Sequence, residues 1–232
     1  MTGKIYLIPS PMGEQDEKRL FPAYNIAVIQ EVNHYIVENV RTARRFIKKV
    51  FPEKDIENTC FYELNKHNPA ENIEQMIQPV FDGFDVGIIS EAGMPCIADP
   101  GSLVVDYAHK KNVQVIPLVG PNSIIMALIS SGFNGQSFVF HGYLPIKDGR
   151  KPFVLQMEQN AQRLKQTQIF METPYRNQQL FSELLTWLRP ATKLCIATDV
   201  TLPTEEIRTY SISEWKKKSV EIQKRPSIFL IM

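Results

Sequence analysis

Short apolar runs alternate with amphipathic helical segments along the first half of the chain, and this alternation is what most limits the possible fold. We expect strands at 4–8, 35–38, 59–63, 85–89 and 113–119. Since a helix lies between most successive strands, the strands are expected to run parallel with helices on both faces of the sheet.

The best-marked helix of this half starts near residue 68. Asn68 can cap it, Pro69 suits its first turn, and Glu71 completes a capping box. Its apolar residues fall on one face at helical spacing: Ile73, Met76, Ile77, Val80 and Phe81.

The second half has strands expected at 137–141, 167–172, 193–198, 207–211 and 227–232, and longer helices near 152–166 and 175–188. Asn122 or Ser123 can cap a short apolar helix that Gly132 ends. The last three strands have little chain between them, which predicts a mixed sheet. The fold class is therefore α/β with two domains, 1–118 and 119–232, the first sheet mainly parallel and the second mixed.

Size and composition exclude several classes. A chain of 232 residues with 44% hydrophobic content can bury one or two cores. It contains no apolar run near the ~20 residues of a membrane-spanning helix, and its polar start does not resemble a secretory signal. The three cysteines lie far apart, which argues against disulfides and fits the cytoplasm. With a net charge of +1, any nucleic-acid contact needs local basic patches.

The stretch "IISEAGMPCIADPG" at 88–101 turns a buried strand into a stiff, acidic loop. Gly93 and Gly101 permit close backbone approach, while the prolines of the loop stiffen it before any ligand binds. Glu91 and Asp99 can meet a cation or a pair of hydroxyl groups. Alternatively, the loop is a tight strand-to-helix turn in which Asp99 caps a helix beginning near Ser102.

Two further strand ends open into similar loops, "IPSPMGE" at 8–14 and "VGPNS" at 119–123. Ligands of open α/β sheets collect at the carboxyl ends of strands, so three such loops indicate a ligand across this edge. Glu38 imitates the ribose-binding acid of a Rossmann fold. However, Pro9 and Pro11 stand where that fold needs its G-x-G-x-x-G turn, so an ordinary Rossmann site is not expected.

Five ordered segments, "IYLIPSPMGE", "SEAGMPCIADPG", "VIPLVGPNSIIMALISSGF", "FHGYLP" and "METPYR", resemble the tetrapyrrole (corrin/porphyrin) methylase superfamily of S-adenosylmethionine (SAM) methyltransferases. The resemblance is greatest to the branch that 2′-O-methylates a cytidine of 16S ribosomal RNA. It implies two α/β domains with SAM in the cleft between them, a homodimer, and 16S rRNA or the 30S subunit as partner, without a membrane.

The resemblance also implies which residues border the cofactor. In the first domain they are Pro9, Ser10, Pro11, Glu91, Ala92, Gly93, Pro95, Ile97 and Ala98. In the second domain they are Ser123, Ala127 and Met171. The acidity of the first-domain loop suits a ligand that carries a sulfonium and an ammonium group.

Some segments depart from the family pattern. Glu91 replaces an aspartate, and the family's Glu-Asp-Thr-Arg reads Glu38-Asn39-Val40-Arg41. The family's Arg-Glu-Leu-Thr-Lys reads 198–202 as Thr-Asp-Val-Thr-Leu, which loses both basic residues. The cofactor side is thus largely kept, whereas the acceptor side has changed.

Methylation of a ribose 2′-hydroxyl needs alignment of the reacting atoms and a base or cation to help deprotonation. Glu38, Glu172 and, less favoured, His67 are candidate bases, and Arg41 and Arg176 can bind phosphate or a carboxylate. Glu38 can equally be an acid favouring a helix N-terminus, and His67 a loop or cap residue. The other histidines show no ligand spacing, and no metal is implied.

Three basic runs can contact RNA phosphates. The first places Arg41, Arg44, Arg45, Lys48 and Lys49 on one helix, with Arg41, Arg45 and Lys48 or Lys49 near one face; the second places Lys147, Arg150 and Lys151 on a flexible loop; the third is 215–218. Solvated helix surface is the alternative reading of such runs.

Three functions follow from these patterns. The leading one is an rRNA ribose methyltransferase, followed by a small-molecule methylase of tetrapyrrole type, and then by a SAM- or RNA-binding module without catalysis.

Overall fold

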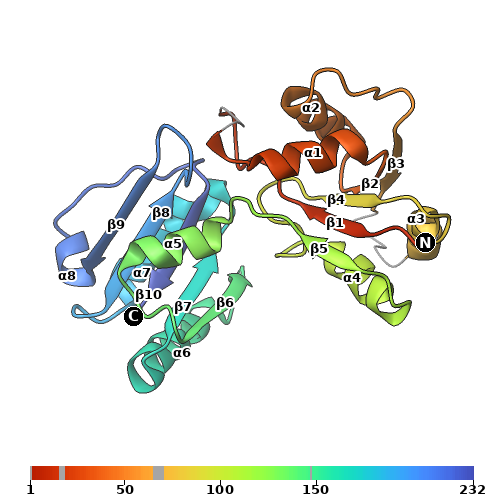
Figure 1. Cartoon of the computed structure of the whole chain (residues 1–232). Coiled ribbons are helices and arrows are strands. Elements are labelled where there is room, and N and C mark those ends of the chain that lie inside the picture. Colours follow the sequence, from red (N-terminus) through yellow and green to blue (C-terminus); the bar gives the residue numbers. More distant parts are fainter. Residues whose placement is uncertain (1, 16–18, 65–70, 147) are drawn as a thin grey trace. The chain divides into compact units, whose positions relative to one another are not determined.

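The chain forms two compact units, Met1–Asn122 and Ser123–Met232, in a computed structural model that describes residues 2–15, 19–64, 71–146 and 148–232 (Figure 1). Each unit contains a five-stranded sheet of its own. Every strand pairing among the described residues lies within one unit.

The sheet of the first unit is parallel throughout, as predicted. Its strands are β1 (Ile5–Ile8), β2 (His34–Val37), β3 (Cys60–Glu63), β4 (Val86–Ile89) and β5 (Val115–Pro117), in the order β3-β2-β4-β1-β5. In register, Ile89 of β4 lies beside both Ile8 and Val37. The carboxyl ends of β1, β2 and β4 therefore meet at one edge of the sheet.

Helices cover both faces of this sheet (Figure 1). They are α1 (Ala23–Glu31), α2 (Val40–Val50), α3 (Ile73–Phe81) and α4 (Gly101–Lys110). One apolar core joins α1 and α2 to the sheet through residues such as Val28, Phe46 and Ile47. A second core joins α3 and α4 to the opposite face through residues such as Ile77 and Val104.

The predicted start of the third helix needs correction. Helix α3 begins at Ile73, after Asn72 in a left-handed conformation with φ 63°. Glu71 precedes the helix, so the predicted capping box does not form its first turn, and Asn68 and Pro69 lie outside the described residues. Four residues of the predicted apolar face, Ile73, Met76, Ile77 and Val80, are buried, whereas the fifth, Phe81, is exposed at the end of the helix.

The sheet of the second unit is mixed, which confirms the predicted fold class. Its strands are β6 (Phe138–Tyr143), β7 (Thr167–Met171), β8 (Lys193–Thr198), β9 (Glu206–Ser211) and β10 (Ser227–Ile231), in the order β6-β7-β10-β8-β9. Only β6 and β7 pair in parallel; β10 is antiparallel to both β7 and β8, and β8 to β9.

Helices also flank this second sheet. They are α5 (Ser123–Ser131), α6 (Arg150–Leu164), the 3-10 turn η2 (Pro174–Arg176), α7 (Asn177–Trp187) and α8 (Ile212–Trp215). A single core joins α6, α7 and α8 to one face of the sheet, with Trp215 buried and its indole donating to the Leu194 carbonyl at 2.8 Å. Helix α5 contacts β8, β9 and β10.

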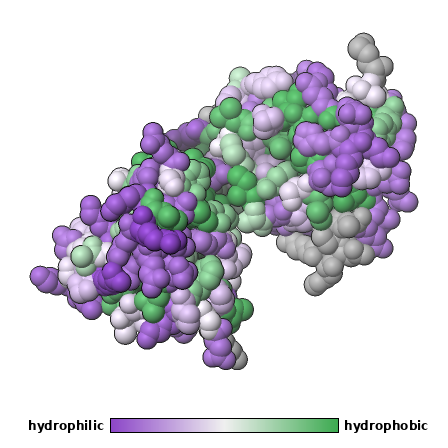
Figure 2. All heavy atoms as spheres, turned by 90° about the horizontal axis from the view of Figure 1, so that it is seen from below, coloured by the Kyte–Doolittle hydropathy of each residue, from purple (hydrophilic) through white to green (hydrophobic). Residues whose placement is uncertain are grey.

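Hydrophilic and hydrophobic side chains are interspersed on the face of each unit that Figure 2 shows. Within the described part of the chain, no helix is long and apolar enough to cross a membrane.

Candidate functional site

Three loops of the first unit come together at the carboxyl edge of its sheet. The loops after β1 and β4 are joined by two backbone bonds, from the Ser10 N–H to the Gly93 carbonyl at 2.9 Å and back at 3.1 Å. The loop after β5 packs on them, since a Cβ on Gly120 would lie 2.2 Å from Cγ of Pro9. The structure thus brings together the three stiff segments on which the ligand prediction rests.

The loop at 90–101 is held by one carboxylate. Asp99 accepts from the backbone N–H of Cys96 at 2.8 Å and from that of Gly101, the first residue of α4, at 2.7 Å. Burial raises the pKa of Asp99 against the opposing effect of these hydrogen bonds. Asp99 therefore organises the strand-to-helix turn, but the predicted cap needs correction, since Pro100 is the N-cap of α4 and Asp99 precedes it.

Two residues of this loop other than glycine are left-handed, Cys96 with φ 70° and Ala98 with φ 61°. Such conformations cost about 1–2 kcal/mol per residue and persist only where the surroundings impose them. Ile97 and Ala98 are both exposed. The fold therefore presents two of the predicted cofactor residues outward on a rigid, strained segment. Burial and the Asp99 charge raise the pKa of the Cys96 thiol to about 12, so it is a poor nucleophile near neutral pH.

A pocket of about 400 Å³ opens beside these loops. Four of the predicted cofactor residues line it, Ser10, Pro11, Glu91 and Ala92. The others in this unit are not among the residues that line it: Pro9, Gly93 and Pro95 are buried, Ile97 and Ala98 are exposed, and Pro95 lines a much smaller hollow with Glu38 and Asp99.

Glu38 and Glu91 lie beside each other at the ends of β2 and β4. The backbone N–H of Glu91 donates to Oε1 of Glu38 at 3.2 Å, and the Thr42 hydroxyl donates to Oε1 of Glu91 at 2.6 Å. Glu38 is half-buried, and Asn39 caps α2 by accepting from the backbone N–H groups of Arg41 and Thr42. The cap of α2 is thus Asn39, while Glu38 faces the loop that follows β4.

The cations of α2 separate onto different sides of the helix. Arg45 and Lys49 line the pocket, whereas Arg44 lies over the Phe61 ring at 5.1 Å and Lys48 donates to the Pro52 carbonyl. The predicted face is therefore right for Arg45 and Lys49. Arg41, however, is exposed and is not one of the described residues that line the pocket.

In the second unit, Glu172 follows β7, is buried, and pairs with two arginines, of which Arg150 is buried and Arg176 is half-buried. Its Oε2 lies 2.5 Å from Arg150 and its Oε1 lies 2.6 Å from Arg176. Burial raises the pKa of Glu172, but the Arg176 hydrogen bond, the Thr173 N–H and the Arg150 charge together hold that pKa below its usual value. The structure thus brings Glu172 and Arg176 together, with both carboxylate oxygens occupied.

Arg150 corrects one predicted basic run. It is the first residue of α6 and only 4% exposed, and it also pairs with Glu183 of α7 at 3.1 Å. A residue expected on a flexible RNA-binding loop is therefore part of the interior, because two acidic partners from other elements neutralise it. Lys151 is exposed, whereas Lys147, like His67, lies outside the described residues.

The third basic run is divided. Trp215 is buried, while the three lysines after it are exposed and Lys218 lies over the Tyr210 ring at 4.4 Å.

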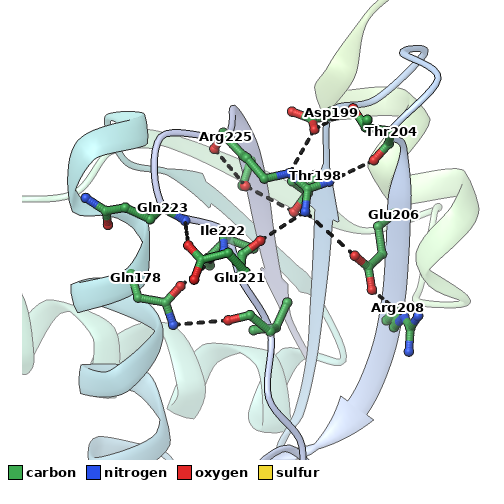
Figure 3. A network of polar contacts seen from close by, with 12 residues as sticks. Gln178, Thr198, Asp199, Thr204, Glu206, Arg208, Glu221, Ile222, Gln223 and Arg225 are labelled. Carbon is green, nitrogen blue, oxygen red and sulfur yellow. Dashed lines mark hydrogen bonds and ion pairs between the residues drawn. The ribbon is translucent and has the colours of Figure 1, made fainter.

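A second ion-pair network, which the sequence did not reveal, joins the ends of β8 and β10 (Figure 3). Arg225 donates to Asp199 Oδ2 at 2.8 Å and to the carbonyls of Thr204 and Glu221. The segment 198–202 lacks the basic residues of the family pattern, yet an arginine from another part of the chain reaches it. Only the tertiary fold brings these two segments together.

The remaining predicted cofactor residues lie in the second unit. Ser123 and Met171 are half-buried, at the start of α5 and the end of β7, and Ala127 is buried within α5. Among the described residues, no group of three or more histidine, cysteine, aspartate or glutamate side chains could hold a metal ion.

One signal in the sequence could have identified the pocket more fully. Thr42, Arg45 and Lys49 follow one another at spacings of three and four, which places them on one face of a helix. Counting back from the basic residues would have added Thr42 to the candidate site. The contact between Thr42 and Glu91 joins segments 49 residues apart and could not be read from spacing.

Solved structures share this two-sheet fold at low sequence identity. The methyltransferase CobJ is 16% identical with a TM-score of 0.63, over 99% of this chain and 94% of that one. Uroporphyrin-III C-methyltransferase from Thermus thermophilus, complexed with S-adenosylhomocysteine, is 16% identical with a TM-score of 0.57, over 99% and 97%.

Curated relatives are more similar in sequence. Ribosomal RNA small subunit methyltransferase I of Streptococcus pyogenes serotype M3 is 31% identical over 213 residues, 92% of this chain and 70% of the relative. The protein of that name from Vibrio cholerae is 28% identical over 90% of this chain and 69% of the relative. The model of the family described as Tetrapyrrole (Corrin/Porphyrin) Methylases matches residues 4–215, so the chain belongs to this methylase family.

Proposed function

We propose that the protein is a SAM-dependent methyltransferase that methylates small-subunit ribosomal RNA at the 2′-oxygen of a cytidine. The observation that carries the RNA assignment is the 31% identity to a ribosomal RNA small subunit methyltransferase I over 92% of this chain. Membership of the methylase family supports the reaction type.

The loop at 90–101 is the proposed seat of the cofactor, which supplies an electrophilic methyl group on a sulfonium. The fit rests on the loop itself: it is fixed by Asp99, exposes Ile97 and Ala98, and carries the Glu91 carboxylate. A loop that is ordered before binding loses little entropy when a ligand arrives. Pro9, Ser10 and Pro11 adjoin it, and Ser123, Ala127 and Met171 are proposed to contribute from the second unit.

The chain's own part in the reaction is alignment and proton removal. Glu38 is the better placed of the two candidate bases within the described residues, because it is half-buried at a strand end beside Glu91. Glu172 would first have to leave Arg150 and Arg176. We therefore assign proton removal to Glu38, and to Glu172 and Arg176 the fixing of the chain after β7. Arg41, exposed at the start of α2, remains a candidate for phosphate contact.

The test is methyl transfer from tritiated-methyl SAM to 30S subunits that lack this modification, followed by mapping of the label. We expect label on a cytidine ribose, loss of label with Glu38→Gln at unchanged SAM affinity, and retention with Glu63→Gln. Glu63 is the matched control, since it ends the neighbouring strand β3 and is exposed.

Other outcomes would name a different function. Label on a uroporphyrinogen-type acceptor, with none on RNA, would mark a tetrapyrrole methylase, and SAM binding without transfer to either would mark a binding module. If the label does appear on the ribose but Glu38→Gln retains full activity, only the assignment of the base fails.

We also propose, from the resemblance alone, that the protein acts as a homodimer in the cytoplasm. Light scattering of the purified protein would give a mass of twice 26.6 kDa. A mass equal to one chain at micromolar concentration contradicts the dimer.

A further inference from the structure

The pocket of the first unit has two kinds of wall. Its floor is apolar, with Val37, Phe46 and Ile89 from three different elements. Its rim carries two cations, Arg45 and Lys49, both from α2, and two carboxylates, Glu14 and Glu91, from the loops after β1 and β4. An apolar floor with cations on the α2 side of the rim suits a ligand with one flat, poorly hydrated part and one anionic part that meets α2.

The volume of the pocket agrees with a single such unit. At about 400 Å³ it lies at the low end of the range of about 300–1,000 Å³ seen for small-molecule sites. One nucleotide fits a space of this size, whereas a base-paired helix does not.

Arg45 is the residue whose position most needs an explanation. Its side chain is exposed and makes no hydrogen bond or ion pair with another described residue. Its neighbour Arg44 lies over the Phe61 ring and Lys48 donates to the Pro52 carbonyl, so these two cations contact the protein surface. A guanidinium at the mouth of a pocket has the five donors that match a phosphate bidentately.

Lys49 adds a second charge one turn further along. Its Nζ donates to the Gln15 carbonyl at 3.0 Å, which holds the ammonium beside the loop after β1. Two cations four residues apart on a helix face the same side. A phosphate between them would pair with the Lys49 ammonium and with the Arg45 guanidinium at the same time.

We propose that this pocket binds one unpaired nucleotide of the RNA acceptor, with its phosphate on Arg45 and Lys49 and its base over the apolar floor. The inference rests on the proposed RNA substrate and adds to it where the RNA is held. The competing occupant is the cofactor, whose carboxylate has the same charge as a phosphate and whose predicted residues Ser10 and Glu91 also line the pocket.

Arg45→Ala, compared with Arg44→Ala as the matched control, separates these occupants. Binding of a 16S rRNA fragment is measured by filter retention at several salt concentrations, and SAM binding by calorimetry. We expect Arg45→Ala to weaken RNA binding about tenfold and to reduce the salt slope by about one, as for a lost phosphate contact, with SAM affinity unchanged. Arg44→Ala should keep the RNA affinity.

Phe46→Leu tests the apolar floor. This substitution should weaken binding of the fragment that carries the unpaired cytidine. Binding of a fragment with an abasic site at that nucleotide should be weakened less. Circular dichroism verifies that the variant is folded. An equal effect on both fragments overturns the assignment of the base.

The outcomes are distinguishable from failure of the proposed function. If Arg45→Ala lowers SAM affinity and leaves RNA affinity intact, the pocket holds the cofactor and the proposal is wrong. If the wild-type protein methylates RNA but Arg45→Ala and Arg44→Ala have equal effects on binding, the phosphate contact is wrong and the function stands. If the wild-type protein neither binds nor methylates RNA, the proposed function itself fails.

Discussion

Gly120 lies so close to the pyrrolidine ring of Pro9 that a residue with a Cβ would not fit without a shift. A Cβ at this position would lie 2.2 Å from Cγ and 2.4 Å from Cβ of Pro9. Because a proline ring cannot rotate away, the two loops that carry these residues would have to separate. This contact sets the distance between the loop after β1 and the loop after β5.

Gly120→Ala should therefore lower the free energy of unfolding by about 1–3 kcal/mol, as overpacked sites do, and weaken SAM binding. Denaturant unfolding and calorimetry measure the two effects. Gly135→Ala is the control, because nothing lies within 4 Å of a Cβ there, and its change should stay within about 0.5 kcal/mol. Equal stability of the two variants would mean that the loops yield freely.

Ionisation of Glu172 makes the free energy of unfolding depend on pH. Its pKa is held below the usual glutamate value, so the ionised form stabilises the folded protein above that value. This contribution is complete at neutral pH and is lost as the pH falls through the lowered pKa.

Glu172→Gln should lower the free energy of unfolding by about 1–3 kcal/mol near pH 7, since two arginines lose a charged hydrogen-bond acceptor while Arg150 keeps Glu183. The difference in free energy of unfolding between wild type and variant should decrease as the pH falls below about 4.3. Unfolding curves recorded across this pH range measure the difference. The control Asp106→Asn removes a carboxylate from an exposed pair with Lys110 and should change stability by less than about 1 kcal/mol. A difference that does not vary with pH would exclude Glu172 as the titrating group.

The loop between β4 and α4 depends on Asp99 for its shape. The Asp99 carboxylate accepts from the backbone N–H groups of Cys96 and Gly101; Cys96 is itself left-handed, and so is Ala98, which lies between the two donors. Without the carboxylate, these hydrogen bonds to the loop backbone are lost. The loop would then have to be ordered by its ligand.

Asp99→Ala should accordingly weaken SAM binding about tenfold or more, because the ordering entropy is now lost on binding. Calorimetry gives the affinity, and a thermal melt verifies the fold. Asp106→Ala, seven residues along on α4, supplies the control. Unchanged affinity in the Asp99 variant would show that the cofactor does not use the fixed form of this loop.

Helix α2 shows what sequence can reveal about an element and what it cannot. The spacing of its basic residues identified the helix and the face of Arg45 and Lys49. It did not assign Arg44 to the Phe61 ring, because β3 is brought beside α2 only by the parallel pairing of β2 and β3.

The two units are separate in their cores. All buried residues of the core around Trp215 come from 144–231, and those of the two cores of the first unit come from 5–118. Each sheet is formed entirely by strands of one unit. Each unit therefore has the interior that independent folding requires.

Fragments 1–122 and 123–232, produced separately, should each unfold cooperatively and give well-dispersed amide spectra. A fragment that lacks dispersion would show that its core needs the other unit. Mixing the two fragments and repeating the spectra distinguishes rescue by contact from failure to fold.

The architecture of both units could be predicted because it follows from local periodicity and short connections. The strand expected at 193–198 is β8 to the residue. What escaped prediction depends on distant partners or on rare backbone conformations. Arg150 stands in a run of charges typical of solvent-exposed chain, and its burial depends on Glu172, Glu183 and the Pro145 carbonyl. Cys96 and Ala98 are residue types that rarely adopt positive φ, so no pattern marks them.

The order of strands has a consequence for synthesis on the ribosome. Strand β1, the earliest in the chain, lies between β4 and β5, while β10, the latest, lies between β7 and β8. Strand β1 therefore gains its second neighbour only after the chain has been synthesised through residue 117, the end of β5. In the second sheet, the newest strand joins two pairs that already exist. A nascent chain that ends before residue 227 would lack β10, so the pairs β6–β7 and β8–β9 would each keep an unpaired strand edge. Such a chain would be more sensitive to proteases than the complete one.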